Sequence, residues 1–163
     1  MNRKAFTLVE LLVVMVIIAV ILGGLFRFFI ANWFAYEDRM VRADLWHEAN
    51  EIIEIMTRDG RVAKTIQATD DAAVKSVLMR DISDNIIAVY SLTPDGQIQM
   101  DRGGDADKLK ILSRNLDFDG SEFSQDGIDR ALKVNLRLET ELFLRTVRIE
   151  TSTEIFPRNV NFN

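Results

Sequence analysis

The feature that most constrains this chain is an apolar run over residues 11–26 that contains no charged side chain. From residue 6 to residue 30 the only charged side chains are those of Glu10 and Arg27, and the segment has no proline. A helix needs about 20 apolar residues to cross the hydrocarbon layer of a bilayer. Because this run is apolar on every helical face, it favours a membrane-spanning helix over an amphipathic surface helix.

The flanking residues predict how this helix is oriented. Arg3 and Lys4 precede the run, which places the N-terminus in the cytoplasm and the rest of the chain outside. A cleaved secretory signal peptide would have a shorter apolar core and a small-x-small cleavage site after it. Here large rings follow the run, as in an interfacial belt, so we expect the segment to be retained. These rings belong to Phe26, Phe28, Phe29, Trp33, Phe34 and Tyr36.

Glu10 needs a specific reason, because a carboxylate at the edge of an apolar span costs a few kcal/mol. One interpretation is that its side chain reaches back to the cytoplasmic headgroups. The other is that it pairs with a cation supplied by another copy of the chain or by another protein.

Residues 4–10, KAFTLVE, followed by the apolar run, resemble the N-terminal processing signal of type IV pilins and of the pseudopilins of type II secretion. The resemblance implies that a prepilin peptidase cuts between Ala5 and Phe6 on the cytoplasmic face and that the Phe6 amine is then methylated. The family usually has Gly where this chain has Ala5. By the same resemblance, Glu10 neutralises the N-terminal amine of a neighbouring subunit in a filament.

The family resemblance also implies the partners of the chain. Membrane lipid surrounds the apolar segment before assembly, and other minor and major pilins or pseudopilins surround it afterwards. An inner-membrane assembly platform and a cytoplasmic ATPase drive the transfer. The implied location is the bacterial inner membrane, with a single pass and a periplasmic C-terminal domain, and then the filament.

The helix is expected to continue beyond the membrane as an amphipathic segment, residues 31–58. No proline occurs before Pro94, and Gly23 and Gly24 are the only local weak points. From residue 6 to about residue 57, a rise of about 1.5 Å per residue predicts a rod of about 75 Å. Apolar residues recur at helical spacing at Trp33, Tyr36, Met40, Val41, Leu45, Ala49, Ile52 and Met56.

After Asp59 and Gly60 the pattern changes to alternation, which indicates strands. The predicted strands are residues 74–79, 86–92, 97–101, part of 108–118, 132–139 and 147–155, with a hairpin turn at 93–96. The predicted fold class is α+β, with the long N-terminal helix packed on an antiparallel sheet. The expected divisions are a leader at 1–5, a membrane or filament-core helix at 6–30, its amphipathic half at 31–58 and a β-rich domain at 59–163.

No cofactor is expected, with calcium as the alternative. The loop that contains Asp101, Asp105 and Asp107 has oxygen ligands of the kind that Ca²⁺ takes, although it lacks EF-hand spacing. A second acidic cluster comprises Asp117, Asp119, Glu122 and Asp126. His47 is the only histidine and the chain has no cysteine, so we expect no zinc site.

Charge excludes nucleic acid as an expected partner. Removal of Arg3 and Lys4 lowers the count of Lys and Arg from 20 to 18 against 25 Asp and Glu, a net charge of about −7. The exported part has no basic patch with interleaved aromatic residues. Neither a Ser, His and Asp constellation nor a glycine-rich phosphate loop is present, so the chain is predicted to be non-enzymatic.

Residues 155–160, IFPRNV, after a long strand pair resemble the C-terminus of the J-type minor pseudopilins and the W-type minor pilins. Glu10 argues against the K-type pseudopilin, which typically lacks that carboxylate. The resemblance implies a subunit that initiates and caps a pseudopilus or type IV pilus. The alternative from another class is an unprocessed, signal-anchored periplasmic protein that binds or senses a ligand, and a tethered enzyme is the third possibility.

Overall fold

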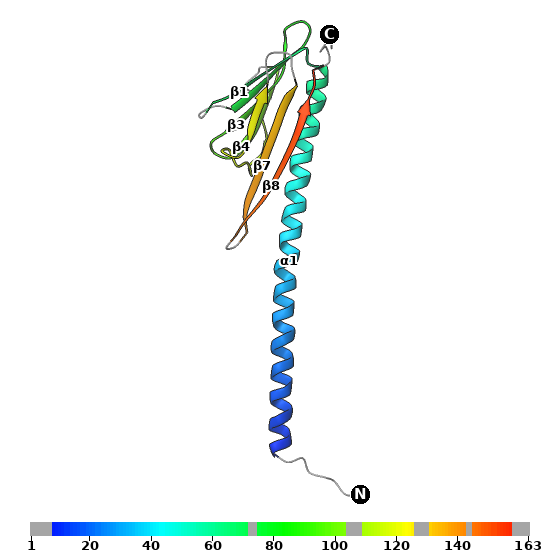
Figure 1. Cartoon of the computed structure of the whole chain (residues 1–163), viewed down its shortest axis with the longest axis vertical. Coiled ribbons are helices and arrows are strands. Elements are labelled where there is room, and N and C mark those ends of the chain that lie inside the picture. The colour runs from blue at the N-terminus through cyan, green and yellow to red at the C-terminus, as the bar shows by residue number, and fades with distance from the viewer. Residues whose placement is uncertain (1–7, 72–74, 104–108, 126–130, 143–144, 158–163) are drawn as a thin grey trace. The chain divides into compact units, whose positions relative to one another are not determined.

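The computed structural model describes residues 8–71, 75–103, 109–125, 131–142 and 145–157 (Figure 1). Within these residues a single helix, α1 (Leu8–Val62), is followed by eight strands. The chain divides into two compact units, Met1–Met40 and Val41–Asn163, which we describe separately. The first unit, as far as it is described, consists of helix alone, and the second contains the rest of α1 and every strand.

Helix α1 extends beyond the predicted end near residue 57 and runs through Gly23 and Gly24 without interruption. Its last turn is closed by Ala63, whose backbone N–H donates to the Asp59 carbonyl over 3.1 Å. Gly60 is buried in this turn, and a Cβ at this position would overlap Ile155. Asp59 and Gly60, which locally favour a helix end, therefore stay helical because the domain packs around them.

The larger sheet is an antiparallel meander with the strand order β1-β2-β3-β4-β5. Its strands are β1 (Thr65–Asp70), β2 (Lys75–Arg80), β3 (Ile86–Thr93), β4 (Gln97–Arg102) and β5 (Lys110–Ser113). The β3 and β4 hairpin has the predicted turn, in which the Gly96 N–H donates to the Thr93 carbonyl over 3.0 Å. Gly96 has a φ of 76°, a conformation that glycine adopts without a steric penalty.

The smaller sheet has the order β6-β7-β8, with β6 (Glu122–Gln125), β7 (Leu132–Leu142) and β8 (Arg145–Ile155). β7 and β8 are its long strands and pair along their whole length, from Leu132 opposite Ile155 to Leu142 opposite Arg145. In Figure 1, β8 lies beside the part of α1 that belongs to the second unit. The Arg42 Nη1 donates to the Arg148 carbonyl over 3.4 Å, so α1 covers the otherwise open edge of β8.

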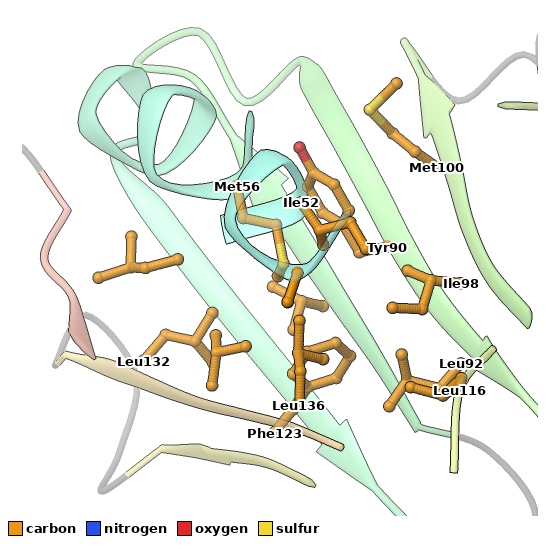
Figure 2. Close-up of a cluster of buried hydrophobic side chains, with 14 of the residues drawn as sticks. Ile52, Met56, Tyr90, Leu92, Ile98, Met100, Leu116, Phe123, Leu132 and Leu136 are labelled. Atoms are coloured by element: carbon orange, nitrogen blue, oxygen red, sulfur yellow. The ribbon is translucent and has the colours of Figure 1, made fainter. Parts of the chain in front are cut away.

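The core of the second unit lies between α1 and the two sheets. Leu45, Ala49, Ile52 and Met56 are buried on one face of the helix, at spacings of three or four residues. Figure 2 shows Ile52 and Met56 among side chains of both sheets, including the fully buried Tyr90. Each large apolar side chain buried in this way contributes about 1.5–3 kcal/mol.

The two sheets are joined by side chains along one seam. The Gln125 side-chain amide accepts from the Ala68 N–H over 3.1 Å and donates to the Ile66 carbonyl over 2.9 Å. Asp70 in turn accepts the Phe123 N–H over 2.9 Å. The free edge of β1 is thus bonded to the Gln125 side chain and the Phe123 backbone of β6 in place of a paired strand.

A second join links the end of β5 to the middle of β7. Leu116 and Leu138 form an isolated antiparallel bridge. On either side of it, the Asp117 N–H donates to the Arg137 carbonyl over 2.8 Å and the Glu139 N–H to the Asn115 carbonyl over 2.7 Å. Residues 115–117 therefore pair with β7 beyond the end of β6.

The predicted fold class is confirmed, and the strands are divided between two sheets. β3, β4, β7 and β8 cover the strands predicted at 86–92, 97–101, 132–139 and 147–155. β2 covers the strand predicted at 74–79 except Val74, which lies outside the described residues, and β5 lies within 108–118. The sequence analysis missed β1 and β6, whose short polar segments TIQATD and EFSQ alternate poorly.

Candidate functional site

The first unit presents a helix with no packing partner of its own. From Leu8 to Tyr36 every residue of α1 is exposed. One window of this helix is long and apolar enough to span a membrane, and none of the window is buried. In water, so much exposed apolar surface is unfavourable at about 25 cal/mol per Å². The segment therefore requires a cover from outside the chain.

Glu10 lies in the first turn of α1 and is exposed. A carboxylate there interacts favourably with the positive end of the helix dipole. Ala5 and Phe6, the residues of the predicted cleavage site, lie outside the described residues. Glu10, the predicted assembly residue, thus lies at the beginning of the helix, while the Phe6 amine, its predicted partner group, lies outside the described residues.

At the other end of the apolar segment the rings form what we call the aromatic collar. It comprises Phe26, Phe28, Phe29, Trp33, Phe34 and Tyr36, all exposed. The Trp33 Nε1 donates to the Glu37 Oε1 over 3.0 Å, and the rings of Phe29 and Trp33 are 6.3 Å apart between centroids. Trp33, Tyr36 and Met40, which the helical pattern grouped with the domain-facing residues, are exposed as well.

In the second unit, a buried carboxylate ends the helix. The Tyr90 hydroxyl donates to the Asp59 Oδ2 over 2.7 Å, and the Arg102 Nη2 lies 3.2 Å from both Asp59 oxygens. Burial, together with the hydrogen bond to the negative carboxylate, raises the pKa of the Tyr90 hydroxyl well above its usual value. The cluster holds a neutral phenol and a paired carboxylate, and this arrangement stabilises the contact between α1 and β3 without offering a proton at neutral pH.

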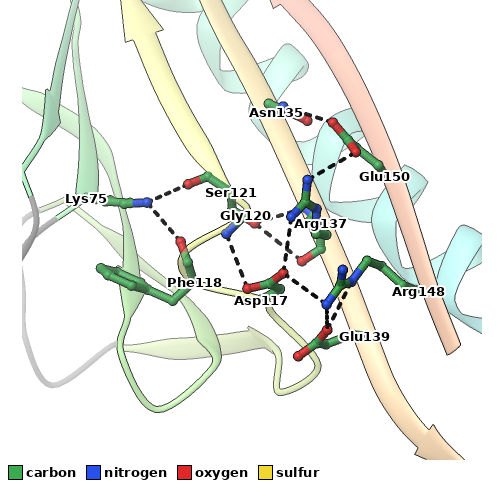
Figure 3. A network of polar contacts seen from close by, with 10 residues as sticks. All are labelled: Lys75, Asp117, Phe118, Gly120, Ser121, Asn135, Arg137, Glu139, Arg148 and Glu150. Atoms are coloured by element: carbon green, nitrogen blue, oxygen red, sulfur yellow. Dashed lines mark hydrogen bonds and ion pairs between the residues drawn. The ribbon is translucent and has the colours of Figure 1, made fainter. Parts of the chain in front are cut away.

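Figure 3 shows that a lysine occupies the loop of the second acidic cluster. The nearly buried Lys75 Nζ donates to the carbonyls of Phe118 and Ser121 over 2.8 and 2.7 Å, and it lies 4.7 Å from the centre of the Phe118 ring. The Asp70 Oδ1 lies 3.9 Å away. The ammonium group of Lys75 thus supplies the positive charge around which this loop closes. Asp126 lies outside the described residues.

The outer face of β7 and β8 carries a ladder of opposite charges. Lys133 lies opposite Glu154, Arg137 opposite Glu150, and Glu139 opposite Arg148. The Arg148 Nη2 lies 2.7 Å from Glu139 Oε2, and this bond raises the pKa of the Arg148 guanidinium. Because the charges alternate in sign, the face lacks the uniform positive potential that a phosphate backbone would require.

The structure describes only one of the three calcium candidates. Asp101 lies near the end of β4, while Asp105 and Asp107 lie outside the described residues. Among the residues that the structure does describe, no group of three or more His, Asp or Glu side chains could hold a metal ion. His47 is exposed on α1.

Two residues to which the sequence analysis gave no role have notable positions. Lys75 was unremarkable among alternating residues, and only the fold brings its ammonium group to the acidic loop. Arg27 had a visible signal, as the only cation within the exposed apolar segment. An ionisable group in such a segment marks a functional position by default.

Comparison with known proteins bears on the N-terminal segment. The family model of the prokaryotic N-terminal methylation motif, a signal of the type IV pilin and pseudopilin class, matches residues 1–26. No curated protein and no solved structure matches the chain. The match contains Glu10 and the apolar run, and the described part of the same segment is the exposed beginning of α1. The chain is therefore prepilin-like, with an N-terminal methylation motif and a pilin-like α+β architecture.

Proposed function

We propose that the chain is a minor pilin or pseudopilin, a structural subunit that helps to initiate and cap a type IV pilus or the pseudopilus of type II secretion. It is inserted in the inner membrane, cleaved between Ala5 and Phe6, methylated at the Phe6 amine and drawn into the filament. The observation that carries this proposal is the overlap of the methylation motif, residues 1–26, with an unburied helix of membrane-spanning length.

The exposed apolar helix supports a role in which its surroundings change from lipid to protein. Before assembly the hydrocarbon layer covers the side chains of residues 8–30, and within a filament the helices of neighbouring subunits replace the lipid. The buried core lies entirely between Leu45 and Ile155, so the second unit does not depend on that cover for its own packing. Chains with this N-terminal signal are generally non-enzymatic structural subunits.

Glu10 is the proposed assembly contact. Its carboxylate would pair with the Phe6 amine of a neighbouring subunit. At an intermediate dielectric, two opposite charges about 4 Å apart attract by about 4 kcal/mol before desolvation is subtracted. Because desolvation opposes much of this attraction, the pair serves chiefly to set the register between neighbours.

The assignment to a minor subunit rests on the resemblance of residues 155–160 to J-type pseudopilins and W-type minor pilins. β8 ends at Ile155, the first residue of this motif, so the motif begins at the end of β8. The proposed partners are a prepilin peptidase, other minor and major subunits, and an inner-membrane assembly platform. Calcium at the loop of Asp101, Asp105 and Asp107 is a separate proposal, which unchanged thermal unfolding on addition of a chelator would refute.

The test of processing is the mass of the N-terminus after co-expression with a prepilin peptidase. We expect a chain that begins at methylated Phe6. Ala5→Leu should block cleavage, whereas Ala35→Leu, the same substitution at an exposed position beyond the apolar run, should leave it intact. An intact Met1 in the wild-type chain would instead support the unprocessed, signal-anchored alternative.

The test of assembly is incorporation into filaments sheared from cells. Glu10→Ala should lower incorporation at least about tenfold, which corresponds to about 1.4 kcal/mol. The matched control is Glu51→Ala, which removes an exposed carboxylate from the same helix within the second unit. If Glu10→Ala assembled as well as Glu51→Ala, the pairing would be wrong even if processing were normal.

A further inference from the structure

Arg27 is an exposed cation in the most apolar part of the molecule. Between Leu8 and Tyr36 the only other charged side chain is that of Glu10. No hydrogen bond or ion pair to Arg27 occurs among the described residues. The positions three and four residues away on either side, where helix neighbours lie, are occupied by Gly23, Gly24, Ile30 and Ala31, so α1 offers no counter-charge there.

The position of Arg27 along the helix matches the thickness of a bilayer. From Leu8, where α1 begins, to Arg27, helix geometry at about 1.5 Å per residue gives about 28 Å. The hydrocarbon layer is about 30 Å thick. If the chain is processed and anchored as proposed above, the backbone of Arg27 therefore lies at the outer boundary of the hydrocarbon.

The side chain of Arg27 is exposed and can reach the phosphate level from this boundary. Long Arg side chains near the end of a membrane helix keep their apolar stem along the helix and extend their charged group to the interface. For Arg27 the nearest interface is the outer one, towards Ile30 and Ala31, neither of which carries a charge.

The chemistry of the boundary selects the partner. A guanidinium group binds phosphate through two parallel hydrogen bonds, and the phosphates of phospholipids lie directly outside the hydrocarbon. The aromatic collar begins at the same level, and such rings are typical of the headgroup layer. The Trp33 hydrogen bond to Glu37 places a carboxylate one turn further out, where water is available.

We propose that Arg27 binds the phosphate group of an outer-leaflet phospholipid and, together with the aromatic collar, sets the depth of α1 in the inner membrane. The inference rests on the membrane stage of the proposed function. It adds a lipid contact that must be released when the subunit leaves the bilayer for the filament.

The test measures the depth of Trp33 with the full chain in vesicles. Trp46→Phe makes Trp33 the only tryptophan, because the chain has two. Its depth is read from quenching by nitroxides placed at different positions along the lipid chains. In phospholipid vesicles, Arg27→Leu should let the helix slide so that Trp33 lies deeper by up to one helical turn, about 5 Å.

Two further variants and a second lipid test whether the effect on depth is specific to Arg27 and to phosphate. Arg39→Leu, the same substitution beyond the aromatic collar, should leave the depth unchanged. Arg27→Lys should fall between the wild type and Arg27→Leu, since an ammonium group keeps the charge but lacks the paired donors. In vesicles of an uncharged glycolipid without phosphate, the wild type and Arg27→Leu should have the same depth, with or without inorganic phosphate in the buffer.

Equal depths of the wild type and Arg27→Leu in phospholipid would overturn the proposal, and so would a difference that persists in the glycolipid. Failure of the proposed function would be recognised by different results. A wild-type chain that keeps Met1, or that alkaline carbonate extracts from membranes, refutes processing or anchoring and does so independently of the position of Trp33.

Discussion

At the scale of single residues, Asp59 shows how tertiary packing extends a helix. A carboxylate in the last turn lies at the negative end of the helix dipole, which is unfavourable. The Tyr90 hydroxyl and the Arg102 guanidinium offset this cost with bonds to both carboxylate oxygens. Sequence periodicity cannot predict these contacts, because Tyr90 and Arg102 lie 31 and 43 residues from Asp59 along the chain.

Tyr90→Phe should lower the free energy of unfolding at neutral pH by about 1.5–3 kcal/mol, the range for a hydrogen bond to a charged group. In the folded state the pKa of Tyr90 is raised above the value of about 10 that it has in the unfolded chain. Its contribution is therefore complete below about pH 10 and is lost as the pH rises through the folded-state pKa. Urea unfolding between pH 7 and pH 11 should show the two chains converging above about pH 10.

Tyr36→Phe is the matched control, since Tyr36 is the only other tyrosine and is exposed on the first unit. It should change the free energy of unfolding of the second unit by less than about 0.5 kcal/mol. A difference between wild type and Tyr90→Phe that stayed constant up to pH 11 would contradict the role of the Tyr90 proton.

At the scale of elements, the seam between the two sheets depends on Gln125. The side-chain amide of Gln125 can donate and accept at once, so it satisfies one N–H and one carbonyl on the edge of β1. The sequence analysis did not predict β1 and β6, because bonds of this long-range kind leave no local pattern. Their stability comes from these long-range bonds rather than from alternation of apolar residues.

Gln125→Leu should lower the free energy of unfolding by about 1–3 kcal/mol, since it leaves the Ala68 N–H and the Ile66 carbonyl without their partner. It should also speed hydrogen exchange at the Ala68 amide. Gln67→Leu, on the exposed face of β1, is the control and should leave that amide protected. Equal exchange rates in the two variants would show that the seam does not depend on Gln125.

At the scale of the whole molecule, the two units differ in what stabilises them. Among the described residues, the hydrophobic core cluster lies between Leu45 and Ile155, and the first unit contributes none of its members. The second unit therefore has a core of its own, while the described helix of the first unit is exposed, as expected if lipid or neighbouring chains cover it in the proposed function.

A fragment that begins at Glu37 should fold, with a free energy of unfolding within about 1 kcal/mol of that of the full chain in detergent. Trp46 fluorescence in urea is the measurement, with Trp33→Phe in the full chain so that both proteins report from the same residue. A fragment that showed no cooperative transition would mean that residues before Glu37 contribute to the core.

By itself, the sequence determined the membrane-length helix, the methylation motif, the α+β class and the strands with clear alternation. These features follow from local composition and period, which act within a few residues. Only the tertiary structure decided the helix end at Val62, the division into two sheets, the edge strands β1 and β6 and the position of Lys75 in the acidic loop. Each of these depends on hydrogen bonds or burial between residues far apart in the chain, and no local pattern encodes such pairs.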